Sequence, residues 1–266
     1  MATLDTVQLA HRLDTLRKNT QETGRLTTEF PTLKIDQAYV IQDEIIKLHV
    51  GEGERVVGMK MGLTSRAKMR QMGIAQPIYG TLTDRMHLVS GSEITLRGLI
   101  HPKIEPEIAF RTRINLSGPI SPEQALAGCA SVFGAMEIID SRYKDFSFAL
   151  PDVIADNCSS SLFVTGPEVA LPGDLDLGNL GMVMEINGVP VKFAASSAIL
   201  GHPAQSLAAL CHLLHARGRS LPAGSIVLAG GATEAVLMEP GQQIRLQVQG
   251  LPDVSLRVNN GEAHGS

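Results

Sequence analysis

The chain has 266 residues, of which 44% are hydrophobic and 4% aromatic, and its formal net charge is -4. This length and apolar content suffice for a sizeable core, in one large domain or two small ones, and they exclude a disordered chain. The 23 basic and 27 acidic residues form no long run of one sign and no segment approaches about 20 apolar residues, so we expect no nucleic-acid partner, no membrane partner, no signal peptide and a cytoplasmic location.

The first ninety residues show mainly helical periodicity. Apolar residues recur at three- and four-residue steps over residues 9–16 and again over 38–48. The pattern then changes to the alternation of a strand over residues 57–61, followed by a short helix from Thr64 to Gly73. We therefore expect residues 1–90 to form a mainly helical N-terminal region.

Strand signals dominate after residue 91, with helices at Pro122–Cys129 and Pro203–Arg217. The Asn187-Gly188 pair between two apolar runs predicts a type I′ hairpin, because both central residues of that turn need positive φ. The expected strands are residues 93–96, 104–112, 133–140, 162–165, 182–193, 225–228, 244–249 and 254–258. Few β-α-β alternations occur, so the predicted fold class is α+β, with a mixed and largely antiparallel β-rich domain over residues 91–266.

Two acids share one face of the strand expected after residue 103. Glu105 and Glu107 are two residues apart, so they would lie about 6.5–7 Å apart, and their repulsion of roughly 2 kcal/mol requires a cationic partner. A solvated strand face is the plain alternative. Pro106 instead favours an edge strand or a bulge, where ligands are often presented.

A third acid, Glu137, lies within the apolar run Ala135–Ile139. A lone carboxylate there is costly unless it is paired or binds a metal. A salt bridge to Arg142 or to a lysine is one solution. The other is a site shared with Glu105 and Glu107, whose all-oxygen donor set suits Mg²⁺ or Mn²⁺ and does not suit zinc.

Lys60 lies between two methionines on the strand expected over residues 57–61 and is flanked by Gly58 and Gly62. Such a lysine has a lowered pKa or serves as a fixed cation beside a developing anion, and a snorkelling lysine on a solvated face is the alternative. The glycines favour close approach of a ligand to the backbone. The polar segments 155–161 and 230–233 are either turns or ligand-binding loops.

Other common site chemistries find no support. The three cysteines, Cys129, Cys158 and Cys211, have neither zinc-like nor redox spacing, so we expect reduced, buried thiols. No dinucleotide fingerprint, P-loop or nucleophile elbow occurs.

Six motifs, in order, resemble those of one family. They lie at residues 58–65, 73–80, 101–109, 136–142, 155–157 and 200–203. Together they are similar to the hydratase and decarboxylase group of the fumarylacetoacetate hydrolase superfamily, which acts at the end of the meta-cleavage route of aromatic breakdown. The resemblance spans Ile35 to Val258 and departs at residues 192–199, where relatives carry a glycine-rich segment. It implies a mixed β-sandwich or roll with the helical N-terminal region packed against it.

The resemblance also implies site residues and a cofactor. It makes Glu105, Glu107 and Glu137 the ligands of Mg²⁺, with Mn²⁺ as a substitute, and Lys60 the active-site lysine. We add Asp84 as a second candidate for proton transfer, with a surface salt bridge as its alternative. Our candidates for binding the substrate carboxylates are Asn157, Ser159, Ser160 and Thr233.

The activity that the resemblance implies is decarboxylation of 2-oxo-3-hexenedioate to 2-hydroxypenta-2,4-dienoate. The 2-oxo group serves as the electron sink for the departing CO₂, so no pyridoxal or thiamine cofactor is needed. Hydration of 2-hydroxypenta-2,4-dienoate is an alternative, and so is a non-catalytic subunit that binds a metal or a small acid. The family further implies a homo-oligomer and a complex with the pathway hydratase.

We also expect an apolar environment for the distal carboxylate of such a substrate. A tight bidentate arginine clamp would favour the bound substrate over departing CO₂. This end of the substrate should therefore lie near Met or Leu side chains.

Overall fold

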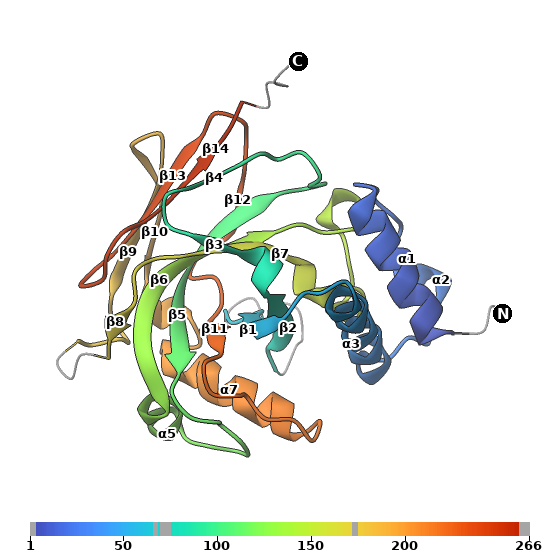
Figure 1. Cartoon of the computed structure of the whole chain (residues 1–266), viewed down its shortest axis with the longest axis horizontal. Helices are drawn as coiled ribbons and strands as arrows, with labels where there is room; N and C mark the ends of the chain where they lie inside the picture. The colour runs from blue at the N-terminus through green and yellow to red at the C-terminus, as the bar shows by residue number, and fades with distance from the viewer. Residues whose placement is uncertain (1–3, 66–68, 70–75, 172–174, 261–266) are drawn as a thin grey trace.

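A computed structural model describes residues 4–65, 69, 76–171 and 175–260 of the chain, and in these residues two β-sheets and a set of helices form the molecule (Figure 1). Three helices open it: α1 (Thr6–Lys18), α2 (Leu26–Glu29) and α3 (Ile35–Gly51). The predicted apolar faces of α1 and α3 are buried, as Leu13 and Ile41 illustrate. The helix expected at Thr64–Gly73 lies mostly outside the described residues.

The larger sheet has nine strands in the order β2-β1-β11-β5-β6-β7-β3, with β12 added to β5 and β8 added to β6. Only the β1–β11 and β3–β7 pairs of this sheet are parallel among the described strands. Its strands are β1 (Val56–Gly62), β2 (Ile78–Thr83), β3 (His87–Val89), β5 (Lys103–Thr112), β6 (Cys129–Ile139), β7 (Ser160–Thr165), β8 (Val169–Ala170), β11 (Ile226–Leu228) and β12 (Val236–Leu237). The mixed, largely antiparallel core is confirmed.

The smaller sheet has five strands in the order β10-β9-β13-β14-β4. Positive φ at Asn187 (53°) and Gly188 (77°) confirms the predicted hairpin between β9 and β10. Glycine at 134 on β6 lets the two sheets approach, because a Cβ there would lie 3.2 Å from methyl groups of Val248 and Val254. The strands are β4 (Ser92–Ile94), β9 (Gly181–Ile186), β10 (Val189–Ala195), β13 (Gln243–Val248) and β14 (Val254–Val258).

In the described part of the chain, three further helices and four short 3₁₀ turns connect the strands. The helices are α5 (Pro122–Ala127), α6 (Leu150–Ala155) and α7 (Pro203–His215). The turns are η1 (Asp84–Met86), η2 (Lys144–Phe146), η3 (Asn157–Ser159) and η4 (Ser196–Ala198). The helices expected at 122–129 and 203–217 are confirmed, and the α+β fold class is correct.

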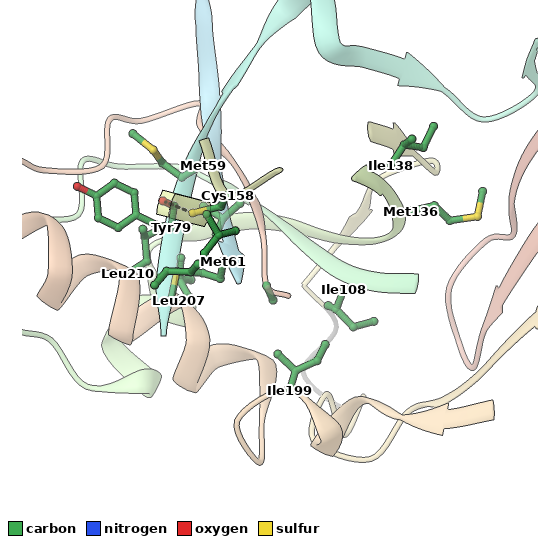
Figure 2. Close-up of a cluster of buried hydrophobic side chains, with 14 of the residues drawn as sticks. Met59, Met61, Tyr79, Ile108, Met136, Ile138, Cys158, Ile199, Leu207 and Leu210 are labelled. Atoms are coloured by element: carbon green, nitrogen blue, oxygen red, sulfur yellow. Dashed lines mark hydrogen bonds between the residues drawn. The ribbon is translucent and has the colours of Figure 1, made fainter. Parts of the chain in front are cut away.

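Side chains from β1, β2 and α7 share one apolar cluster. Figure 2 shows Leu207 and Leu210 of α7 close to Met61 of β1 and Tyr79 of β2. Cys158 belongs to the same cluster, and its thiol donates to the Tyr79 carbonyl at 3.0 Å. All three cysteines are buried and free of disulfides, as predicted.

The predicted boundary near residue 90 stays a prediction, and β1 and β2, which precede it, belong to the same sheet as β5. None of the described helices is long and apolar enough to cross a membrane.

Candidate metal centre and its cavity

The pairing of β5 with β6 brings the three predicted glutamates together. Glu105 lies directly opposite Glu137 in the antiparallel register, and Glu107 follows two residues later on the same face of β5. One oxygen from each carboxylate lies within 4.8 Å of the others. Glu107 and Glu137 are fully buried, and Glu105 is half-buried. The solvated strand face offered as the alternative is therefore wrong.

Pro106 does not place β5 at an edge, because β6 pairs on one side of β5 and β11 and β12 pair on the other. The expectation of an edge strand is wrong, because the strands that pair with this side of β5 leave a gap at Pro106. β11 pairs with residues 109–111 and β12 with residues 103–104, so no strand lies beside Pro106 on that side. The loop 229–235 lies there instead, and the Ala232 N–H donates to the Pro106 carbonyl at 2.9 Å. A residue without an N–H costs no ladder hydrogen bond at this position.

This loop supports the carboxylates with backbone. The Gly230 N–H donates to Glu107 Oε2 at 2.6 Å. Gly230 has a φ of +111°, and a Cβ there would collide with Thr64. A Cβ at Gly231 would collide with the carboxylate of Glu105. The sequence marked 230–233 only as a possible turn or ligand-binding loop, and its contact with the glutamates depends on tertiary packing.

Lys60 is the cation of the cluster. It lies on β1, 2% exposed, and its Nζ donates to Glu137 Oε2 at 2.9 Å. Burial acts to lower the pKa of Lys60, but the negative charge of Glu137 and its neighbours outweighs burial and holds the pKa above its usual range. The snorkelling and lowered-pKa alternatives are therefore wrong, and Lys60 is a fixed cation.

Glu137 forms a salt bridge with Lys60, which was one of the alternatives predicted for this buried carboxylate. Arg142, the other partner considered, instead forms a buried ion pair with Asp156.

The acidic cluster places three carboxylates close together around Glu107. Burial, followed by the charges of Glu137 and Glu105, raises the pKa of Glu107 well above its ordinary value. Glu107 Oε1 and Glu137 Oε1 are buried and have no hydrogen-bond partner among the described residues. Buried polar atoms are normally paired, and carboxylate oxygens are the donors that hard divalent cations prefer. The donor set therefore fits Mg²⁺ or Mn²⁺.

A cavity of about 620 Å³ lies beside the cluster. Lys60, Glu105 and Lys103 line it together with apolar side chains. No arginine is present among the described lining residues, and the expectation of no arginine clamp stays a prediction. The apolar part is made of Leu63, Ile78, Ile139, Phe146, Phe148, Val153 and several alanines.

Two of the four residues predicted to bind substrate line this cavity. Ser159 is buried, and its Oγ has no hydrogen-bond partner among the described residues. Thr233 is half-buried, and its hydroxyl donates to the Glu234 carbonyl at 3.0 Å. Both residues therefore lie in the wall of the cavity.

The other two do not line it. The Asn157 side chain accepts from the Thr81 N–H at 2.8 Å and donates to the Thr81 carbonyl at 2.9 Å, so it ties η3 to β2. Residues 157–159 all have positive φ, between 45° and 58°, and this anchor holds the left-handed turn that presents Ser159. Ser160 lines a separate polar pocket with His49 and Arg142.

Asp84 also lies away from the cavity lining that the structure describes. Its carboxylate accepts from the Arg55 N–H and from Arg55 Nε, both at 2.9 Å. This is the surface salt bridge that was its alternative.

Sequence reasoning missed two side chains that line the cavity. Lys103 precedes Glu105 by two residues on β5, so strand alternation would have placed it on the same face. Phe146 comes from η2, whose short irregular backbone has no sequence periodicity to detect.

Comparison with known proteins relates the chain to one family. Residues 48–259 match the model described as fumarylacetoacetate (FAA) hydrolase C-terminal. A 4-oxalocrotonate decarboxylase from Pseudomonas sp. (strain CF600) is 45% identical over 94% of this chain and 95% of its own length. A 2-hydroxyhexa-2,4-dienoate hydratase from Comamonas testosteroni is 35% identical over 87% of this chain and 89% of its own.

A solved structure agrees with this relation. The 4-oxalocrotonate decarboxylase from Pseudomonas putida, complexed with magnesium and adipate, superposes with a TM-score of 0.93 at 41% identity. The match covers 97% of this chain and all of the other.

Proposed function

Because the chain belongs to the fumarylacetoacetate hydrolase family, we propose that it is a metal-dependent decarboxylase that converts 2-oxo-3-hexenedioate, also called 4-oxalocrotonate, to 2-hydroxypenta-2,4-dienoate. The observation that carries the proposal is the cluster of Glu105, Glu107 and Glu137, in which two buried carboxylate oxygens have no hydrogen-bond partner among the described residues. The described lining of the cavity beside it combines apolar side chains with Lys60 and Lys103, which suits a short dianionic acid. The similarity to decarboxylases over nearly the whole chain supports this reading.

The three glutamates would hold Mg²⁺ or Mn²⁺. When bound, the cation supplies positive charge beside the 2-oxo acid end of the substrate and favours the negative charge that develops there. Gly230 keeps Glu107 in place through its N–H, and Lys60 does the same for Glu137. The chain thus fixes the donors before a ligand arrives.

The substrate carries its own path for the electrons. The bond to the distal carboxylate breaks, its electron pair moves through the conjugated carbons to the 2-oxo oxygen, and one proton is taken up to give the enol. Lys60, charged beside the cluster, stabilises the negative charge near that oxygen. The aromatic and aliphatic side chains of the wall lower the local dielectric constant, which strengthens these electrostatic interactions.

Hydration is the second candidate, since a hydratase relative also matches most of the chain. It would use the same carboxylate cluster but would need a positioned base at the vinyl end of its substrate.

Product analysis distinguishes the candidates. Purified protein loaded with Mg²⁺ should release one CO₂ for each 2-oxo-3-hexenedioate consumed. Hydration of 2-hydroxypenta-2,4-dienoate without CO₂ release from the diacid would establish the hydratase reading. Turnover of neither compound would leave a non-catalytic binding subunit.

A further inference from the structure

Lys103 presents a cation on the cavity wall at a defined distance from the acidic cluster. It shares a face of β5 with Glu105 and Glu107, because all three alternate along the strand. The spacing of alternate residues sets Lys103 about 6.5–7 Å from Glu105 along the strand.

No described carboxylate forms a salt bridge with Lys103, and its Nζ instead lies 4.3 Å from the centroid of the Phe146 ring. The other lysine of the cavity, Lys60, is engaged by Glu137 at 2.9 Å. An aromatic face holds an ammonium in position without neutralising its charge. Lys103 therefore keeps its positive charge available to an anionic ligand.

The backbone that presents Phe146 is strained. Asp145 and Phe146 have φ of 56° and 55°, in the left-handed region that non-glycine residues seldom adopt. Such conformations cost on the order of 1–3 kcal/mol each and cluster at ligand sites. Phe148, whose ring centroid lies 6.0 Å from that of Phe146, continues the apolar wall. The Lys103 ammonium is thus held at an apolar part of the cavity.

We propose that Lys103 selects dicarboxylic over monocarboxylic 2-oxo acids by binding the carboxylate distal to the glutamate cluster. The inference rests on the proposed function for the orientation of the ligand, with its 2-oxo acid end at the glutamates. A single ammonium is a point charge, which holds a carboxylate less rigidly than a bidentate guanidinium does.

A single ammonium suits a carboxylate that leaves as neutral CO₂. An interaction with the distal carboxylate weakens as its charge is lost, so it contributes to binding of the substrate more than to the transition state. Replacing Lys103 should therefore raise KM more than it lowers kcat.

The test compares two unreactive ligands, 2-oxoadipate and 2-oxohexanoate, in which a methyl group replaces the distal carboxylate. Calorimetric titration of the Mg²⁺-loaded protein should show tighter binding of 2-oxoadipate. Lys103→Met should weaken the binding of 2-oxoadipate about tenfold or more, the scale of a charge-assisted hydrogen bond, and should leave the binding of 2-oxohexanoate unchanged. Lys103→Arg, which keeps the charge, should retain the preference and provides a second variant should Lys103→Met fail to fold.

The matched control is Lys144→Met, because Lys144 is 64% exposed and pairs with Glu22 outside the cavity. It should bind both ligands as the wild type does. An unchanged diacid preference in Lys103→Met would overturn the Lys103 assignment even if the wild type released CO₂ normally. A lost preference in Lys103→Met together with no CO₂ release by the wild type would support the assignment and overturn the proposed reaction.

Discussion

Two buried acidic sites in this molecule are built in opposite ways. Asp14 in α1 is 5% exposed and has three side-chain partners: Arg17 at 3.0 Å, Lys18 at 2.7 Å and His49 at 3.1 Å. Burial acts to raise the pKa of Asp14, but the hydrogen bonds from these neighbours outweigh it and lower the pKa. Both oxygens of Asp14 have partners.

The glutamate cluster has the reverse balance. Three carboxylates lie close together, the pKa of Glu107 is raised, and two buried oxygens have no hydrogen-bond partner among the described residues. The described residues therefore satisfy both oxygens of Asp14 and leave Glu107 Oε1 and Glu137 Oε1 without a partner. A bound cation would satisfy these two oxygens, and this difference distinguishes the glutamate site from the Asp14 site.

The largest expected effect comes from removing one carboxylate of the cluster. Glu107→Gln should lower CO₂ release from 2-oxo-3-hexenedioate by about 10²–10³-fold, the scale for loss of one electrostatic stabiliser. Exhaustive chelation of the wild type should abolish activity, and Mg²⁺ or Mn²⁺ should restore it. Glu168→Gln is the control, since Glu168 pairs with Arg111 away from the described cavity lining. Normal turnover and metal affinity in Glu107→Gln would contradict the three-glutamate site.

Removal of the cluster's cation should have the next largest effect. Lys60→Ala should reduce turnover by at least about 10²-fold, because a fixed charge beside the reacting oxygen is lost. Circular dichroism and Mn²⁺ binding should show that fold and metal site persist. Loss of folding instead would assign Lys60 a purely structural role.

The Asp14 site should respond in stability and not in catalysis. Asp14→Asn should lower the free energy of unfolding by about 2 kcal/mol, because buried hydrogen bonds to charged groups are lost. Urea denaturation measures this change, and the kcat of the folded variant should match the wild type. A loss of activity larger than the loss of folded protein would contradict the separation of the two sites.

The smallest expected effect is in pH dependence, where the two sites should act with opposite signs. The raised pKa of Glu107 contributes stability below the ordinary glutamate pKa and loses it as pH rises through the folded-state value. In metal-free protein, Glu107→Gln should therefore gain in melting temperature relative to the wild type as pH increases. Added Mg²⁺ should stabilise the wild type and offset this gain.

The lowered pKa of Asp14 has the opposite effect on the pH dependence of stability. Its contribution is present above the ordinary aspartate pKa and is lost as pH falls through the folded-state value. The difference in stability between the wild type and Asp14→Asn should shrink in acid. If the difference in stability from the wild type changed with pH in the same direction for Glu107→Gln and Asp14→Asn, the opposite shifts of the two pKa values would be contradicted.

What the sequence predicted followed from local patterns. Alternation along one strand placed Glu105 and Glu107 on the same face, and the cost of a lone acid in an apolar run singled out Glu137. The register that aligns Glu105 with Glu137 is non-local, but the two strands follow one another along the chain, joined by residues 113–128, and needed only antiparallel pairing.

What the sequence did not predict depends on contacts between distant segments. β2 is buried at all six residues, so it shows no alternation. Asn157 binds the backbone of Thr81, 76 residues away, which removed it from the candidate ligands. Gly230 supports Glu107 across 123 residues. No periodicity within one segment reports such contacts.

The glutamate cluster should bind one divalent cation, and the Asp14 site should bind none. Electron paramagnetic resonance of Mn²⁺ titrated into chelated protein tests this difference directly, because free and bound Mn²⁺ differ in signal. We expect one tight Mn²⁺ per chain in the wild type and in Asp14→Asn, and loss of that site in Glu107→Gln. Retention of the Mn²⁺ site in Glu107→Gln, or its loss in Asp14→Asn, would show that the glutamate cluster is not the metal site.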